Sequence, residues 1–280
     1  KNNRSYLLNN ADYQPKNIGE KLIRCILKDK SEKNIISTFD SLEEKMSILK
    51  DRHKGETLYL LNCGPSLNEY DFNYLRNELK YKTVFSVKQA FNYFPEITNY
   101  HFFNCSNLPL TSHFYLKRHY DYTKYKPTVI ASSNYDLGLR WSKQQKIDIF
   151  FKIPIRTEID NEFLSITHKF DEYKFKNTLT RPCGPGILYE TVFHMAVHMG
   201  FKEIICIGWD LRQTNANDND YEHFYGQTKG LFNRGDVLDW EIDITTKASK
   251  PLYYWLKEQG ISLKVASSSA VYEGIPRIKV

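Results

Sequence analysis

Short apolar runs alternate with longer amphipathic stretches along most of this 280-residue chain. The stretches between several of the runs have apolar residues at helical spacing, as in LNEYDFNYLRNELK, GILYETVFHMAVHMG and ASKPLYYWLKEQG. Short strands that alternate with helices are typical of βαβ units and a parallel sheet. The seven predicted strands lie in TLYLLNC (57–63), KTVFSV (82–87), NYHFFNC (99–105), PTVIAS (127–132), KIDIFFKI (146–153), EIICIGWD (203–210) and SLKVAS (262–267).

The pattern predicts an α/β, Rossmann-like fold: a mostly parallel sheet flanked by helices, with right-handed crossovers. The first 54 residues differ, because they are polar and charged and two of their segments have helical spacing. In the second segment, STFDSLEEKMSILKDR, Thr38 or Ser41 is positioned to cap the helix. We therefore expect a helical extension at 1–54 and one catalytic domain at 55–280.

Polar residues with short side chains follow most of the predicted strands. In parallel sheets, ligands bind beyond the carboxyl ends of the strands. Turns favour the same residue types, so a single cluster says little, but several at one edge of a sheet favour a ligand-binding rim. The clusters are Asn62-Cys63-Gly64-Pro65-Ser66, Lys88-Gln89, Asn104-Cys105-Ser106-Asn107, Ser132-Ser133-Asn134, Gly208-Trp209-Asp210 and Ser267-Ser268-Ser269.

The first cluster, NCGPSL, ends an apolar run in a Gly-Pro corner. A glycine at Gly64 permits close backbone approach, and the helix expected after it offers free N–H groups to an anion. Ser66 is the expected N-cap of that helix. The corner lacks the GxGxxG and GK[ST] patterns of the common nucleotide folds, so an ordinary turn and a phosphate site both stay open.

A second Gly- and Pro-rich loop, TRPCGPG, leads into the amphipathic helix ILYETVFHMAVHM, which Gly200 ends. Arg181 precedes the loop and is suited to bind a phosphate or carboxylate. We expect this helix N-terminus to face the same ligand as the first. His194 and His198 stand four residues apart, as in half a metal site, but no HExxH pattern accompanies them, which favours packing or surface histidines.

A long polar stretch at about 211–240 is predicted to form a lid, because such long connections are uncommon in compact domains. It contains His223, and a histidine titrating near neutrality is a natural general base. The acidic residues Asp218, Asp220 and Glu222 either hold a metal or are solvated.

Composition narrows the classes of function only slightly. The net charge is +6 and is spread along the chain, which fits an acidic sugar, a nucleotide or a phospholipid surface and does not require a nucleic acid. The five cysteines form no CxxC pair and predict free thiols in a reducing compartment. No apolar run approaches the 18 residues or so needed to span a membrane, and the first residues lack the pattern of a signal peptide, so we expect neither a span nor a leader within these residues.

These motifs together resemble the small bacterial sialyltransferases of glycosyltransferase family 42. LLNCGPSLNEYDFNYL is similar to the NGPSL opening of that family, and VFSVKQAFNYF and YHFFNCS to its second and third strands. TRPCGPGILYETVFHMAVHMGFKEIICIGWDLRQ is similar to its Arg-x-Thr-Ser-Gly loop, helix and following strand. The resemblance covers roughly 57–213 in this order.

The resemblance implies a GT-A-type fold and an enzyme that uses a CMP-activated sialic acid without a metal or other cofactor. His223 matches the base on the lid of the family. The residues that match donor contacts are Asn62, Gly64, Pro65 and Ser66 after the first strand, Gln89 and Asn104 near the sugar or ribose, Arg181 and Gly184 in the second loop, Asp210 after the sixth strand, and Tyr221 and Tyr225 on the lid.

Three departures put the donor sugar in question. Lys88 stands where the family has Asn, Cys183-Gly184-Pro185 replaces Thr-Ser-Gly, and the lid before His223 is shorter. The predicted function is transfer of a sialic-acid-like sugar, a nonulosonic acid or Kdo, from a CMP-sugar to an oligosaccharide or glycolipid of the cell surface. We expect a cytoplasmic homo-oligomer, working at the inner face of the membrane through peripheral contact.

A second resemblance leaves an alternative open. The Gly-Pro-Ser-Leu corner, the helix into KEIICIGWDL and the H-x-x-G from His223 to Gly226 are also similar to 6-hydroxymethylpterin pyrophosphokinase-like proteins, a group that includes the Maf proteins. Its enzymatic members transfer diphosphate from ATP with magnesium, which would make Asp210, Asp218 and Asp220 metal ligands. A third reading is a nucleotide-binding module without turnover.

Overall fold

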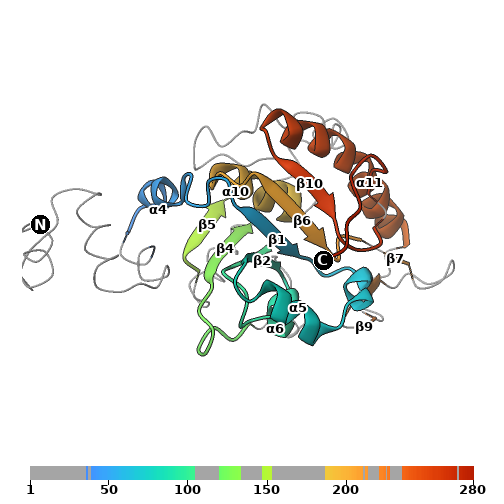
Figure 1. The fold of residues 1–280 in the computed structure, drawn as a ribbon, viewed down its shortest axis with the longest axis horizontal. Helices are drawn as coiled ribbons and strands as arrows, with labels where there is room; N and C mark the ends of the chain where they lie inside the picture. The colour runs from blue at the N-terminus through green and yellow to red at the C-terminus, as the bar shows by residue number, and fades with distance from the viewer. Residues whose placement is uncertain are drawn as a thin grey trace, which may run out of the picture.

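A seven-stranded, all-parallel sheet forms the centre of the computed structural model, which describes residues 36, 39–104, 120–133, 147–152, 187–210, 212–213, 221–224, 226–227, 235–269 and 271–280. The strand order is β10-β6-β1-β2-β3-β4-β5 (Figure 1). The strands are β1 (Thr57–Leu61), β2 (Thr83–Val87), β3 (Tyr100–Asn104), β4 (Thr128–Ser133), β5 (Ile149–Lys152), β6 (Glu203–Ile207) and β10 (Ser262–Val265).

Each of the seven strands coincides with one of the runs predicted from the sequence, β4 extending one residue beyond its run to Ser133, so the predicted α/β class is confirmed. The strands are apolar on both faces because helices cover both sides of the sheet. In β1, Leu58 and Leu60 point to one core cluster, whereas Tyr59 and Leu61 contact the other. This alternation follows from the two-residue repeat of a strand.

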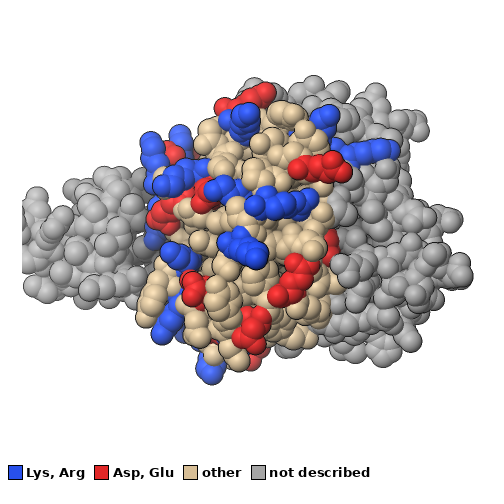
Figure 2. Space-filling model, turned by 45° about the vertical axis from the view of Figure 1, so that its right-hand side comes forward, with Lys and Arg blue, Asp and Glu red and all other residues tan. Residues whose placement is uncertain are grey.

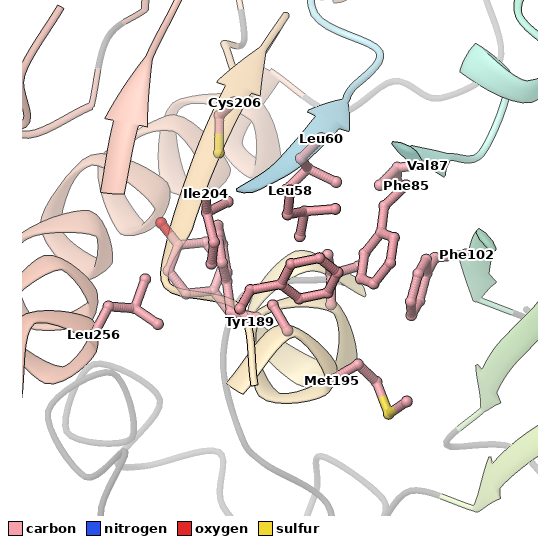
Figure 3. Packing of buried hydrophobic residues seen from close by; sticks show 14 of the residues in the cluster. Leu58, Leu60, Phe85, Val87, Phe102, Tyr189, Met195, Ile204, Cys206 and Leu256 are labelled. Carbon is pink, nitrogen blue, oxygen red and sulfur yellow. The ribbon is translucent and has the colours of Figure 1, made fainter. Parts of the chain in front are cut away.

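Helices pack on each face of the sheet. One face is covered by α4 (Leu42–Leu49), η4 (Leu188–Val192), α10 (Phe193–His198) and α11 (Gly235–Glu258). The other is covered by η1 (Pro65–Glu69), α5 (Phe72–Leu79) and α6 (Ala90–Tyr93). Figure 3 shows the first core, where Tyr189 and Met195 of the η4–α10 segment lie under Leu58 and Phe85 of the strands.

The helix predicted at 67–80 is broken into two. A five-residue 3₁₀ helix, η1, follows the Gly-Pro corner, and α5 begins only after Asp71, whose side chain accepts a hydrogen bond from the backbone N–H of Tyr74 at 2.8 Å. The predicted capping role of Ser66 is wrong, because Gly64 is the N-cap and Ser66 lies inside η1.

The described part of the N-terminal extension, from residue 39 to 54, packs on the sheet domain. Ser41 caps α4 in a capping box with Glu44, which confirms one of the two caps predicted. Met46 and Leu49 are buried in the same core as the strands, and the Nε2 of His198 donates to the carbonyl oxygen of Met46 at 2.7 Å. The domain boundary at 54 stays a prediction.

The segment predicted as a lid contains regular structure. A small antiparallel sheet is formed by β7 (Arg212–Gln213), β8 (Tyr221–His223) and β9 (Gly226–Gln227). Helix α11 begins at Gly235, within the range expected for the lid. Over the described part of the chain, no helix combines the length and the apolar character needed to cross a membrane.

The histidines of α10 serve packing, as predicted. His194 is buried beside the ring of Trp255, with 4.9 Å between centroids, and burial lowers its pKa to about 3. Burial also lowers the pKa of His198. Among the residues that the structure describes, no three His, Cys, Asp or Glu residues gather as a metal site would require. Cys63 and Cys206 are thiols outside any disulfide, as predicted for these two.

Candidate functional site

The strand order reverses at β1, whose two neighbours are β2 and β6. The chain runs outward from β1 to β5, then returns to place β6 and β10 on the other side of β1. In open α/β sheets, ligands bind in the crevice at this topological switch point, beyond the carboxyl ends of the strands. The corners after β1 and β6 are therefore where the candidate site lies.

These two corners are in direct contact. The backbone N–H of Gly64 donates to the carbonyl oxygen of Gly208 at 2.8 Å, and that of Asn62 donates to Ile207 at 2.9 Å. A Cβ atom at Gly64 would lie 2.6 Å from the Gly208 oxygen and closer still to oxygens of Asp210. Only glycine allows this approach, which explains why the apolar run of β1 ends in a Gly-Pro corner.

Asp210, shortly after the neighbouring strand β6, bonds to the Gly-Pro corner that follows β1. Its carboxylate accepts from the backbone N–H of Ser66 at 3.2 and 3.3 Å, and from the Ser66 hydroxyl. The Oγ atoms of Ser66 and Ser267 lie 3.0 Å apart, and Ser267 Oγ accepts from the backbone N–H of Gly208 at 2.9 Å. Hydrogen bonds thus join the segments that follow β1, β6 and β10. The backbone N–H of Ser66, which the sequence offered to a ligand anion, donates instead to a carboxylate of the protein itself.

Two buried polar atoms beside the switch point lack a hydrogen-bond partner among the described residues. Asn62 is 4% exposed; its Nδ2 donates to the carbonyl oxygens of Leu60 and Ile207 at 3.3 Å, but its Oδ1 accepts no hydrogen bond from a described residue. The Nε1 of Trp209, shortly after β6, likewise has no acceptor in the described part of the chain. Buried polar atoms are usually paired, so this acceptor and this donor are candidate contacts for a ligand.

Two further polar side chains lie on the same face at the carboxyl ends of strands: Asn104 is the last residue of β3, and Ser132 is the penultimate residue of β4. They are register partners on the parallel strands β3 and β4. By strand alternation, Asn104 shares the face of Tyr100 and Phe102, and Asn62 shares the face of Leu60; both are faces of the first core. Ser132 is fully buried. The carboxyl edge therefore carries amide and hydroxyl groups on the face that η4 covers.

Gln89 lies in the next corner of the sheet, after β2, where it is the N-cap of α6. The residue is 94% buried. Its Oε1 is 3.9 Å from the thiol of Cys63, which also donates to the carbonyl oxygen of Val87 at 3.1 Å. The corners after β1 and β2 are thus linked through Cys63, and Gln89 lies beside the NCGPSL corner.

Lys88 has a left-handed backbone, with φ at 48°, which is uncommon for a residue other than glycine. Its N–H donates to Phe102 at 2.8 Å, and its carbonyl oxygen accepts from Nε2 of His101 at 2.9 Å. Tyr122 donates to Nδ1 of His101 at 2.7 Å, and burial lowers the pKa of that histidine to about 3. A neutral buried histidine thus helps to fix the cationic residue at the rim, a role the sequence analysis missed because His101 appears there as one polar residue in an apolar strand.

A segment 161 residues farther along the chain, from Cys63 to Phe224, reaches the same corner. Phe224 follows β8; its N–H donates to the carbonyl oxygen of Cys63 at 3.2 Å, and its own carbonyl oxygen accepts from Nδ2 of Asn68 at 2.9 Å. Neighbouring Cα atoms are about 3.8 Å apart, so the backbone of His223 also lies at this corner. The predicted base and the NCGPSL corner, distant in sequence, are brought together.

Helix η4 begins at the same edge, because α10 leads through Gly200 to the amino end of β6. The backbone N–H of Phe193 bonds to the carbonyl oxygen of Leu188, five residues back, which is the hydrogen bond of a π-helix. Such turns are rare and occur frequently at functional sites. Tyr189, within this turn, is buried near the ring of Trp209, with 6.1 Å between centroids.

Several predicted site residues lie outside the described part of the chain. They are Arg181, Gly184, Asp218, Asp220 and Tyr225, together with the side chains of Tyr221, Glu222 and His223.

Comparison with known proteins gives likeness of structure alone. No protein-family model matches the chain, and no curated protein sequence matches it. One similar solved structure is the sialyltransferase CstII from Campylobacter jejuni in complex with a substrate analogue, cytidine-5'-monophosphate: 16% identity, TM-score 0.41, covering 76% of this chain and 80% of that one. Another is the MAf glycosyltransferase from Magnetospirillum magneticum AMB-1: 10% identity, TM-score 0.48, covering 93% of this chain but 41% of that one. At these identities and scores, neither likeness assigns a substrate or a reaction.

Proposed function

We propose that this protein is a glycosyltransferase that moves a sialic-acid-like sugar, a nonulosonic acid or Kdo, from a CMP-sugar to a surface-glycan acceptor. One observation carries the proposal: the hairpin with His223 is bonded to the NCGPSL corner through Phe224 and Cys63, at the switch point of a parallel sheet. A candidate base and a candidate nucleotide pocket therefore share one edge of the sheet.

The nucleotide is proposed to bind across the corners after β1 and β6. Asn62 Oδ1 offers an acceptor and Trp209 Nε1 a donor, and both are buried and unpaired among the described residues. Gln89 and Asn104 are proposed to contact the ribose or sugar. Asp210, Pro65 and Ser66 shape the corner, since the Asp210 carboxylate already accepts from Ser66.

The phosphate and the acidic sugar require positive or donor groups. Arg181 and the backbone of Gly184, ahead of η4, are proposed to contact the phosphate, together with the hydroxyls of Tyr221 and Tyr225. Lys88 brings a cationic residue to the end of β2, in a backbone conformation that its neighbours enforce. A cation at this edge suits a donor sugar that carries a carboxylate.

The proposed reaction is one inverting displacement. The acceptor hydroxyl gives its proton to His223 as its oxygen attacks the anomeric carbon. The bond between that carbon and the phosphate oxygen of CMP breaks, and the phosphate leaves with its charge stabilised by hydrogen-bond donors. His223 then releases the proton to water. No metal is needed, because the phosphate leaves as a stable anion.

The magnesium-dependent diphosphokinase alternative receives less support from the site. It would use Asp210 as a ligand, but both carboxylate oxygens of Asp210 accept from the backbone N–H of Ser66, so a metal would compete with this donor. The acceptor, the homo-oligomeric state and the action at the inner face of the membrane stay predictions.

A thermal-shift panel tests the proposal. We would measure the unfolding temperature with CMP, CDP, UDP, ADP, GDP and ATP, each with and without magnesium. A ligand at 100 times its dissociation constant stabilises the fold by about 2.7 kcal/mol, which such a panel detects. We expect CMP or CDP to raise the unfolding temperature irrespective of magnesium. Stabilisation by ATP with magnesium alone would instead establish the kinase, and no shift with any nucleotide would contradict both.

A further inference from the structure

We propose that Phe224 is a positioning residue: it anchors the β8–β9 hairpin to the corner after β1 and so fixes the place of His223. The part that concerns His223 as a base rests on the proposed function, whereas the anchoring of the hairpin does not. The proposal stands on the ring contacts of Phe224, on its two backbone hydrogen bonds and on the shortness of the hairpin.

The ring of Phe224 is held by aromatic residues of the main domain. Phe224 is 6% exposed. Its ring centroid is 4.7 Å from that of Tyr93 and 5.9 Å from that of Phe72, with interplanar angles of 73° and 69°. Phe72 in turn packs against Phe94 at 5.0 Å. Edge-to-face pairs of this kind are favourable beyond the area they bury.

Both main-chain polar groups of Phe224 are satisfied by the corner. The N–H bonds to Cys63, between Asn62 and Gly64, and the carbonyl oxygen bonds to the side chain of Asn68 in η1. Turn residues usually lie on the surface, where water satisfies these groups. A turn residue with a buried ring and two bonds to another element is therefore a docking point.

The hairpin has little stability of its own. Strand β8 has three residues, and β9 and β7 have two each. An isolated two-stranded hairpin is at best marginally stable in water. A sheet as short as this one therefore depends on its contacts with the rest of the domain. His223 and Gly226 are register partners on β8 and β9, on either side of the turn that contains Phe224. Whatever holds Phe224 therefore determines where His223 lies.

Phe224 belongs to the core cluster on the α5 face of the sheet, but two of its partners lie at the surface. Tyr93, one of its ring partners, is 37% exposed, and Asn68 is exposed as well. Truncation of Phe224 should therefore weaken this cluster at its edge and release the hairpin, while the core on the other face of the sheet stays closed. Because a displacement of about 1 Å can reduce an enzymatic rate by about 100-fold, a released hairpin should lower turnover more than nucleotide binding.

Hydrogen exchange tests the anchoring without reference to activity. We would measure exchange in peptides spanning 221–227 in the wild type, Phe224→Ala, Phe224→Leu and Asn68→Ala, with the denaturation midpoint in parallel. Tyr81→Ala is the matched control, since Tyr81 is an aromatic residue that is 88% exposed. We expect exchange at 221–227 to accelerate about 10-fold or more in Phe224→Ala and less in the other two, while β1 and β6 stay protected. Unchanged exchange in Phe224→Ala would overturn the anchor.

Kinetics test the positioning of His223. The probe is release of CMP from CMP-N-acetylneuraminic acid. We expect kcat to fall about 10- to 100-fold in Phe224→Ala with KM changed less than about 3-fold, and partial recovery in Phe224→Leu. Wild-type kcat in Phe224→Ala, despite faster exchange at 221–227, would overturn the positioning role. A wild-type protein that binds no cytidine nucleotide would contradict the proposed function, and the exchange measurement would still decide on the anchor.

Discussion

At the scale of single residues, the candidate site depends on close contacts that few side chains permit. Gly64 lets the ends of β1 and β6 meet. The Asp210 carboxylate accepts a hydrogen bond from the backbone N–H of Ser66, which a free helix end would offer to a ligand. Lys88 keeps a left-handed backbone because His101 and Phe102 bond to it on either side.

Gly64→Ala should disrupt the corner. The added Cβ would stand 2.6 Å from the Gly208 oxygen, so β1 and β6 must separate at their ends. We expect a loss of about 1–3 kcal/mol in the free energy of unfolding and at least a 10-fold weaker affinity for CMP, measured by denaturation and calorimetry. Gly55→Ala is the control: φ is 79° but no atom lies within 4 Å of the added Cβ, so it should lose about 1 kcal/mol and keep CMP affinity.

His223→Ala tests the proposed base. We expect kcat for sugar transfer to fall by about 100-fold or more, because general-base catalysis contributes about that factor, while CMP affinity stays within 3-fold. His53→Gln is the control, since His53 bonds to Glu56 and Tyr100 near the amino ends of β1 and β3, away from the site. Turnover near the wild-type value in His223→Ala would exclude His223 as the base.

At the scale of elements, caps and breaks decide where each helix starts. Asp71 begins α5 and leaves η1 as a separate turn at the corner. Helix α4 begins at the Ser41–Glu44 capping box, and its apolar side reaches the core under β5 and α10. The π-turn of η4 begins at Leu188, next to the edge of the site.

Ser41→Ala should destabilise α4. The substitution removes the oxygen that accepts from the backbone N–H of Glu44, so we expect a loss of about 1 kcal/mol in the free energy of unfolding, measured with urea. Ser47→Ala is the control, because Ser47 is exposed in the middle of the same helix and alanine is a better helix former there. An equal loss in both variants would show that the cap is not the cause.

At the scale of the whole molecule, two helical layers enclose a parallel sheet, and the ligand edge lies where its strand order reverses. Figure 2 shows basic and acidic side chains interspersed over one face of the described chain, in line with the modest net charge of +6. On this face the charge forms no continuous basic tract of the kind that follows a nucleic-acid backbone.

Stability should fall in acid because two histidines are buried as neutral groups. Burial lowers the pKa of His101 and of His194 to about 3, below the usual 6.5 or so of an unfolded chain. Between these values the unfolded state binds more protons, so stability present above pH 6.5 or so is lost as pH falls toward 3, by up to about 1.4 kcal/mol per pH unit for each histidine. Urea denaturation between pH 7 and 4 measures the slope. His194→Phe should reduce it, and an unchanged slope would contradict this assignment.

The sequence by itself determined the seven strands, the α/β class and the polar ends of the strands, because two-residue and 3.6-residue periodicities and turn chemistry are local properties of a chain. It also placed Asn62, Gly64 and Gln89 at one edge. Only the tertiary structure decided that Asp210 occupies the Ser66 N–H, that His101 shapes Lys88 and that Phe224 docks on Cys63. Each of these contacts joins residues separated by a crossover or more, and their pairing depends on strand order and register, which no local pattern encodes.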